Sequence, residues 1–117
     1  MLNIEKFRDY CLSRQGEITE HFPFDEHILV FKVFGKMFAL TDIRGFVSIN
    51  LKCDPDRAVQ LREQYPGIQP GYHMHKQQWN TVSTEGSVPD DLLLELIDHS
   101  HEQVVAKLPK KIQKLLE

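Results

Sequence analysis

The stretch that decides the fold is ILVFKVFGKMFALTDIRGFVSINLK, residues 28–52. Its first two runs, residues 28–35 and 36–41, are rich in β-branched and aromatic residues and are too short for typical helices. They predict two strands that form a hairpin and turn near Gly35–Lys36. The TDIRG sequence that follows them predicts a second turn.

A third strand is predicted over residues 46–52, where apolar and polar residues alternate. Successive side chains of a strand point to opposite faces of the sheet. The two faces are Val47, Ile49 and Leu51 on one side and Ser48, Asn50 and Lys52 on the other. This pattern is typical of an antiparallel sheet with one face against a core and the other partly in water.

Helices are predicted before and after these strands, each with a capping residue, a proline or a glycine at a boundary. They are residues 4–15, between Asn3 and Gly16; residues 55–65, capped by Asp54; about 89–107; and a last short turn or helix from Pro109. Further strands are predicted around Ile18, near 71–75 and near 79–84. The chain is therefore expected to form one α+β domain over residues 1–117, with an antiparallel sheet of hairpins packed against N-terminal and C-terminal helices.

The composition is that of a soluble globular protein, because 41% of the residues are hydrophobic and 26% are charged. No apolar run approaches the roughly 20 residues of a membrane helix, and the start, MLNIEKFRDY, lacks the pattern of a signal peptide. Cys11 and Cys53 form neither a CxxC motif nor a dense framework, which favours a reducing compartment. We expect a cytoplasmic protein without a membrane partner.

Charge is distributed unevenly around a net charge of −3. Residues 32–80 carry seven bases and four acids, and residues 107–117 carry four lysines and one acid. Residues 1–31 carry three bases and six acids, and residues 81–106 carry six acids and no Lys or Arg. Two basic zones therefore alternate with two acidic ones, which permits a local surface for an anionic ligand although the chain as a whole is not basic.

The sequence PGYHMHKQQWNTVS, residues 70–83, contains His73 and His75 one residue apart. On a strand the two imidazoles would face the same way, but a catalytic zinc would need a third protein ligand. His99 and His101 lie in a predicted helix, where residues i and i+2 point in different directions. Strongly spaced zinc motifs such as HExxH are missing. We therefore expect no metal and no other cofactor.

The candidate catalytic groups all have structural explanations. Cys11 lies on the apolar stripe of the first predicted helix, and Cys53, the more exposed thiol by position, has no evident electropositive surroundings. The paired acids Asp90–Asp91 and Asp54–Asp56 suit the starts of helices. The sequence contains no GxSxG, P-loop or GxGxxG motif. The protein is therefore not expected to be an enzyme.

The remaining pattern combines bases, amides and one aromatic residue at predicted turns and strand ends. Lysines and arginines at such places can reach phosphates. Trp79 can stack on a base or, alternatively, pack against the long C-terminal helix. The candidate nucleic-acid-binding residues are Lys36, Arg44, Lys52, Lys76, Trp79, Lys110 and Lys111.

Several motifs resemble those of the MmcQ/YjbR family of small bacterial proteins. The most specific are Pro70–Gly71–Tyr72–His73–Met74, Trp79–Asn80–Thr81–Val82 and Leu108–Pro109–Lys110–Lys111. The stretches FRDYCLSRQGEITEHFPF and VFKVFGKMFAL are similar as well, so the resemblance covers almost the whole chain. It implies an α+β fold related to the frataxin-like arrangement, with a double-wing motif for which the family's members are labelled predicted DNA-binding proteins.

The leading hypothesis is therefore a non-catalytic DNA-binding protein whose hairpins contact phosphates. The alternative is a protein-interaction module, or a small-ligand or metal-binding module with a frataxin-like fold. If the module binds iron, the ligands would be four acids whose spacing places them on one face of the long predicted helix: Asp91, Glu95, Asp98 and Glu102. The third hypothesis, an enzyme, would require that three polar side chains converge in one pocket: Tyr72, His73 and Asn80.

Overall fold

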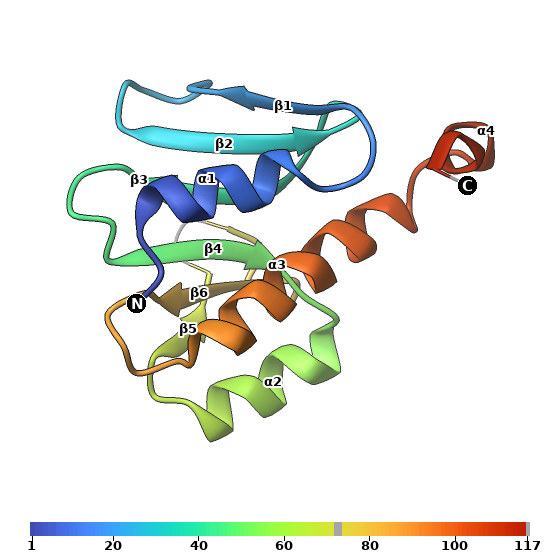
Figure 1. Ribbon diagram of the computed structural model, residues 1–117. Helices are drawn as coiled ribbons and strands as arrows, with labels where there is room; N and C mark the ends of the chain where they lie inside the picture. The colour runs from blue at the N-terminus through green and yellow to red at the C-terminus, as the bar shows by residue number, and fades with distance from the viewer. Residues whose placement is uncertain (72–73, 117) are drawn as a thin grey trace.

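The computed structural model describes residues 1–71 and 74–116, and within them the chain forms a six-stranded antiparallel sheet with helices packed against it (Figure 1). In their order across the sheet, the strands are β1 (Ile18–His21), β2 (Ile28–Val33), β3 (Lys36–Asp42), β4 (Ser48–Lys52), β6 (Trp79–Ser83) and β5 (Ile68–Pro70). The helices are α1 (Ile4–Leu12), α2 (Pro55–Gln64), α3 (Asp90–Val105) and α4 (Lys110–Gln113), followed by a short 3₁₀ helix, η1 (Lys114–Leu116). The expected α+β fold is confirmed.

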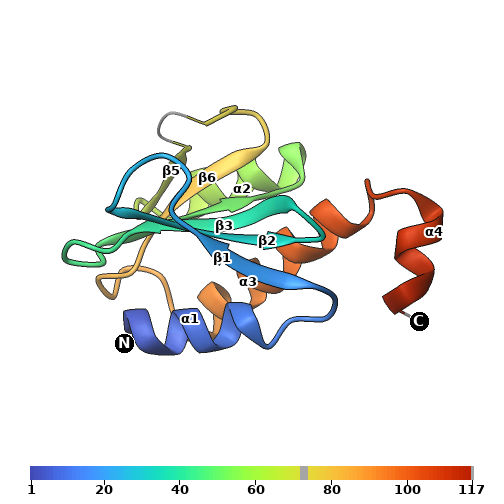
Figure 2. The ribbon, with the colours of Figure 1, turned by 90° about the horizontal axis from the view of Figure 1, so that it is seen from above.

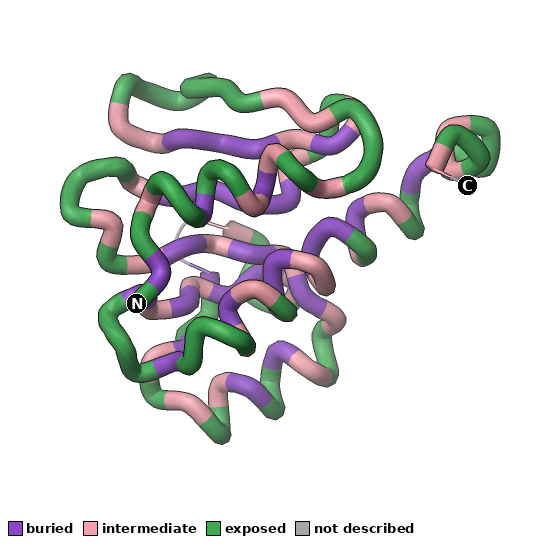
Figure 3. The backbone as a smooth tube through the Cα atoms, viewed as in Figure 1, coloured by how far each residue is buried: buried purple, intermediate pink, exposed green. Residues whose placement is uncertain are grey.

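Helices α1 and α3 cover one face of the sheet, which we call the inner face (Figures 1 and 2). The main hydrophobic core lies between them, and α2 adds Ala58 and Leu61 to it. The buried stretches of the backbone run along β2 to β4 and along α3, whereas α4 projects away from the sheet (Figure 3). The core therefore fixes α3 against the strands, and α4 begins beyond the buried Leu108.

The two faces predicted for the third strand are confirmed for residues 48–52, which form β4, but not for Val47, which lies before the strand, is 50% exposed and does not join Ile49 and Leu51 in the core. Ile49 and Leu51 are buried in the core, whereas Asn50 and Lys52 are half-buried on the opposite face, which we call the outer face. The strand begins at Ser48 and not at the predicted position 46. Phe46 has a φ of 48°, in the left-handed region, so the extended backbone can begin only after it.

The predicted hairpin is formed by β2 and β3, and its turn lies at Phe34 and Gly35, one residue earlier than expected. Both residues have positive φ, 46° and 81°, as a tight hairpin turn requires. Phe31 pairs with Ala39 while Lys32 pairs with Met37, so β3 contains one extra residue at this point. The turn and the bulge together fix where the end of the hairpin, with Lys36, projects.

Trp79 lies on the outer face, in a small cluster with Val30 and Leu40. Its side chain is only 7% exposed, so the ring is not an open stacking platform. Its strand neighbour Asn80 and the next inner residue, Val82, are buried on the opposite face. The sequence alone left the two faces of this strand undecided, and the packing of Val82 in the main core decides them.

Two helix ends differ from the expected ones by two or three residues, whereas the second helix, α2, matches its predicted bounds to within one residue. The first helix, α1, ends at Leu12 and not at 15, and the long helix, α3, ends at Val105 and not at 107. The end of α3 has a physical cause, because the ring of Pro109 would collide with the carbonyl of Val105 in a continuing helix. The longest helix, α3, has 16 residues, and no helix within the described ranges combines the length and the apolar character of a membrane span.

The strand expected near residues 71–75 is wrong for the described residues of that stretch, Gly71, Met74 and His75, none of which lies in a strand. The strand at this place, β5, ends at Pro70, and the Gly71 N–H donates to the Trp79 carbonyl at 2.8 Å. A Cβ atom on Gly71 would lie 2.8 Å from the Cβ of Trp79, so only glycine permits this close departure from the sheet. The His75 carbonyl accepts from the Trp79 N–H, which places His75 in a turn. His73 lies outside the described residues.

Candidate anion-binding site

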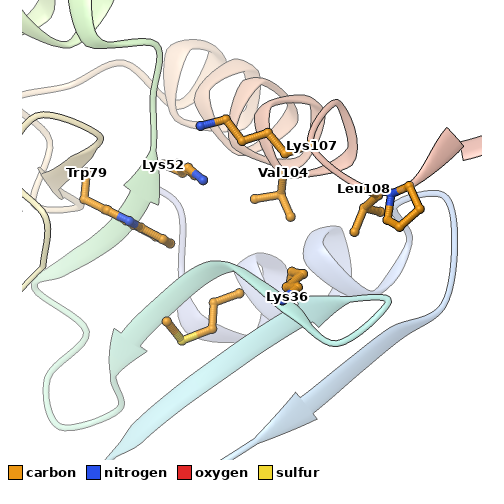
Figure 4. Close-up of a pocket in the computed structure, with 8 residues that line it drawn as sticks. Lys36, Lys52, Trp79, Val104, Lys107 and Leu108 are labelled. Carbon is orange, nitrogen blue, oxygen red and sulfur yellow. The ribbon is translucent and has the colours of Figure 1, made fainter. Parts of the chain in front are cut away.

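Three lysines from three separate elements surround one pocket at an end of the sheet (Figure 4). Lys36 begins β3, Lys52 ends β4, and Lys107 follows the last turn of α3. The pocket has a volume of about 220 Å³, and its other lining residues are Met37, Trp79, Val104, Leu108 and Pro109. We call this arrangement the lysine pocket.

Hydrogen bonds between α3 and the sheet bring the three lysines together. The buried hydroxyl of Ser100, in α3, accepts from the Lys52 backbone N–H at 2.8 Å and donates to the Phe38 carbonyl. One side chain thus fastens α3 to both β3 and β4. The chain continues past the ends of the strands from this point, so that Lys107 reaches the same pocket as Lys52 (Figures 1 and 4).

The lysines and the arginines of this protein differ in whether their charges are neutralised. Four of the five arginines form ion pairs with carboxylates: Arg8, Arg14, Arg44 and Arg57. Among the described residues, none of the nine lysines forms an ion pair. The positive charge that is available to a ligand is therefore carried mostly by lysines, and three of them line one pocket.

The environment of Lys52 strengthens the case for an anion. Burial lowers the pKa of the Lys52 ammonium, and the positive charge of Lys107 lowers that pKa further. Both effects disfavour the charged form of Lys52 in the empty pocket, and a bound anion would oppose both of them. The apolar walls formed by Trp79 and Val104 reduce the local dielectric, which focuses the field of the lysines into the pocket.

The structure brings together three of the seven predicted nucleic-acid-binding residues, Lys36, Lys52 and Trp79. Lys110 and Lys111 lie on α4, directly after the pocket residue Pro109, and are exposed. The indole of Trp79 forms a wall of the pocket and is largely covered.

Two other predicted residues lie elsewhere. Arg44 is in the turn between β3 and β4, at the opposite end of β3 from Lys36, and donates to both carboxylate oxygens of Asp42. Lys76 lies between β5 and β6, where Arg62 donates to its carbonyl, and does not line the pocket. Sequence reasoning missed Lys107, whose only local signal is its place directly before Leu108–Pro109, where the long helix has to end.

Two of the four acids proposed for iron are engaged in other contacts. Glu95 accepts from Arg57, and Asp98 accepts from Tyr10 and Arg14. No group of three or more potential metal ligands occurs in the part of the chain that the structure describes. Of the histidine pairs, His99 and His101 have separate partners, the Asp54 N–H and the Gln15 carbonyl. The pair His73 and His75 cannot be assessed together, because His73 is not among the described residues.

Both thiols are buried, and Cys53 is the more exposed of the two, as expected, at 4% against 0% for Cys11. Burial raises the pKa of the Cys53 thiol to about 11, and burial also raises the pKa of the Cys11 thiol far above its ordinary value. Both groups are therefore protonated thiols at neutral pH, in which form a cysteine is a poor nucleophile. The pocket of Tyr72, His73 and Asn80 that an enzyme would require includes residues outside the described ranges.

A family model and two curated relatives place the chain among the same group of proteins. The family model described as YjbR matches residues 14–103. The chain is 32% identical over 117 residues to the uncharacterised protein YjbR of Escherichia coli strain K12, an alignment that covers 98% of each chain. It is 42% identical over 93 residues to the uncharacterised protein YbdF of E. coli O157:H7, which covers 79% of this chain and 76% of YbdF.

Two solved structures share the fold. The crystal structure of the Deinococcus radiodurans protein DR2400, with a DUF419 domain, gives a TM-score of 0.92 at 40% identity and covers 99% of this chain and 88% of that one. A Pseudomonas syringae protein gives a TM-score of 0.72 at 29% identity, covering 85% of this chain and 96% of that one. The sheet and helices that build the lysine pocket are therefore part of a shared scaffold.

Proposed function

The chain belongs to the YjbR family, and on that premise we propose that it is a non-catalytic protein that binds DNA by contacting phosphates at the lysine pocket. The observation that carries the proposal is the convergence of Lys36, Lys52 and Lys107 on one pocket, none of them paired with a carboxylate of residues 1–71 or 74–116. Lysines in such a position neutralise phosphates and fix a protein on DNA without reading its sequence. The double-wing geometry that the family resemblance implies stays a prediction.

The distribution of charge supports an approach from one end of the molecule. Lys110, Lys111 and Lys114 follow the pocket directly and extend its positive charge along α4 and η1. The exposed acids at the start of α3, Asp90 and Asp91, would repel a phosphate backbone laid along the helix. DNA would therefore contact the strand ends and α4, and would leave the first turns of α3 in solvent.

A binding role is favoured over a catalytic one by the chemistry of the described residues. Both thiols are protonated, and the groups that line the lysine pocket are three amines and apolar side chains. Three clustered ammonium groups attract an anion, but the pocket lining contains no carboxylate or imidazole that would take up a proton.

The experiment that tests the proposal is a titration of labelled duplex and single-stranded DNA followed by fluorescence anisotropy across a salt series. For duplex DNA, each neutralised phosphate contributes about 0.9 to the slope of log affinity against log salt concentration. We expect each of Lys36→Ala, Lys52→Ala and Lys107→Ala to lower this slope by about one. Lys6→Ala, an exposed lysine of α1, is the matched control and should leave the slope unchanged.

Two results would overturn the proposal. The first is the absence of salt-dependent binding to either DNA at low ionic strength. The second is an equal loss of slope in the Lys6 control, which would show that binding is diffuse. A titration with inorganic phosphate, followed by NMR, separates the alternatives: phosphate binding at Lys52 without DNA binding would replace DNA with a small anion as the ligand.

A further inference from the structure

A second and larger cavity lies on the outer face of the sheet, at the opposite end of β3 and β4 from the lysine pocket. Its volume is about 630 Å³, within the range of about 300–1,000 Å³ that is usual for small-molecule sites. Apolar side chains from three regions of the chain form most of its walls: Phe24, Ile28, Leu40, Val47 and Met74. We call it the outer cavity.

Exposed apolar side chains gather at the mouth of the outer cavity. Phe24 is 62% exposed and Val47 is 50% exposed, and both line the cavity. They lie in the β1–β2 and β3–β4 connections, which are joined by a hydrogen bond from the Ile43 N–H to the His27 carbonyl at 2.9 Å. Large apolar side chains left in water at the rim of a cavity are typical of a ligand site.

The floor of the outer cavity offers hydrogen-bond donors. The Oδ1 atom of Asn50 accepts from the Thr81 hydroxyl, which leaves the Asn50 amide N–H groups to donate elsewhere. Within the described residues, neither these N–H groups nor the Ser48 hydroxyl has a hydrogen-bond partner. A ligand in the cavity would therefore contact both apolar side chains and hydrogen-bond donors. A carbonyl oxygen on the ligand could accept from those donors.

The charges at the cavity select against anions. Asp42 and Arg44 neutralise each other, with the Arg44 Nη2 atom 2.7 Å from the carboxylate. A second carboxylate of the lining, that of Asp25, accepts from the backbone N–H groups of His27 and Ile28. The lining thus contains two carboxylates and one guanidinium, and its net formal charge is opposite in sign to that of the lysine pocket.

The geometry points to a binding site for a small, uncharged, mainly apolar molecule with a carbonyl acceptor at one end. Its apolar body lies between Phe24, Val47 and Met74, and its carbonyl accepts from Asn50 and Ser48. This site is separate from the lysine pocket, and the inference does not depend on DNA binding.

Prodan tests the inference, because this uncharged dye consists of an apolar naphthalene with one ketone and its emission shifts to the blue when it leaves water. We expect a saturable blue shift on titration with the full chain. In ¹⁵N NMR, the amides of residues 22–27 and 43–50 should shift, and those around Lys107 should not. The absence of a blue shift, or shifts centred on the lysine pocket, would overturn the proposal.

Two substitutions in the outer cavity test whether the dye binds there, and a third, outside the cavity, is the control. Val47→Asp places a charge at the apolar mouth, and Asn50→Asp keeps the acceptor for Thr81 but removes the amide donors. Each variant should weaken prodan binding about tenfold or more. Asn50→Asp leaves the dye's ketone oxygen without its donors, and Val47→Asp places a charge against the apolar ring. Val59→Asp, at an equally exposed valine of α2, is the control and should bind prodan as the unmodified chain does.

Equal binding by the Val47→Asp and Val59→Asp variants would also overturn the inference. Both valines are about half exposed, at 50% and 48%, so both variants should fold, which circular dichroism verifies. Salt-dependent DNA binding by the Val47→Asp variant should be unchanged. The two proposals can therefore fail separately, because each is tested by variants at its own end of the molecule.

Discussion

The Nε2 atom of His99 accepts a hydrogen bond from the Asp54 backbone N–H at 3.1 Å. An imidazole can accept there only when that nitrogen is unprotonated. Burial lowers the pKa of His99, and the nearby guanidinium of Arg57 lowers it further. A single side chain in α3 thus makes the attachment of the chain at the start of α2 dependent on pH.

The pH dependence of stability follows from the direction of this shift. Because the pKa of His99 is lower in the folded state, the unfolded chain binds a proton first as the pH falls. The contribution of His99 to the free energy of unfolding is present above about pH 6.5, the ordinary pKa of histidine, and is lost as the pH falls from there through the folded-state pKa. Urea unfolding at pH 7.5 and at pH 5 measures this loss.

The His99→Gln variant separates this effect from other titrations, because glutamine keeps an acceptor for the Asp54 N–H and does not titrate. Between pH 7.5 and pH 5 the variant should lose less stability than the unmodified chain. An equal loss in both proteins would show that His99 is not the group responsible.

At the scale of the secondary-structure elements, local signals in the sequence predicted most helix starts. Asn3 caps α1 by accepting from the Lys6 N–H at 2.8 Å, and Asp54 caps α2 by accepting from the Arg57 N–H at 3.0 Å. Both interactions span three residues, so the pattern that specifies them is visible in the sequence. The turn at Gly35 was predictable for the same reason.

The Asp54→Ala variant should lower the free energy of unfolding by about 1 kcal/mol, the usual value for loss of an N-cap side chain. Asp56→Ala is the control, since Asp56 is exposed in the first turn and has no hydrogen-bond partner among the described residues; at high salt, which screens its interaction with the helix dipole, its loss should destabilise the protein less than the loss of Asp54. Equal destabilisation of the two variants in urea titrations would contradict a specific capping role for Asp54.

The error over residues 71–75 arose at the same scale but from a non-local cause. The alternation of residues there suggested a strand, yet β5 has three residues and ends at Pro70. The close contact between Gly71 and Trp79 decides where the chain leaves the sheet, and it depends on pairing with a strand that comes later in the sequence. No local pattern reports such a contact.

At the scale of the whole molecule, the lysine pocket could be predicted only in part. Lys36 and Lys52 were identified from their places at strand ends, but Lys107 comes from a separate basic zone. It joins them because α3 packs across β3 and β4 and continues beyond the strands. Whether a basic side chain is paired with a carboxylate cannot be read from the sequence. Three of the four arginines that form ion pairs do so with acids at least 12 residues away along the chain.

Ser100 connects the parts of the molecule that build the pocket, over separations of 48 and 62 residues. Ser100→Ala would remove the partners of the partly buried Lys52 N–H and of the Phe38 carbonyl, and we expect a loss of about 1–3 kcal/mol in the free energy of unfolding. Ser87→Ala is the control, because Ser87 is exposed and such changes usually stay within about 0.5 kcal/mol. Thermal and urea unfolding of both variants measure the difference, and equal stability would show that this contact contributes little.

The small cluster of Val30, Leu40 and Trp79 also acts as a partition. Leu40 lines the outer cavity and Trp79 lines the lysine pocket, and the two linings have no described residue in common. Substitutions at either end can therefore accumulate without touching the residues of the other. If both proposed sites bind ligands, relatives with the same scaffold could lose one of them by drift and keep the other, provided that the partition is preserved.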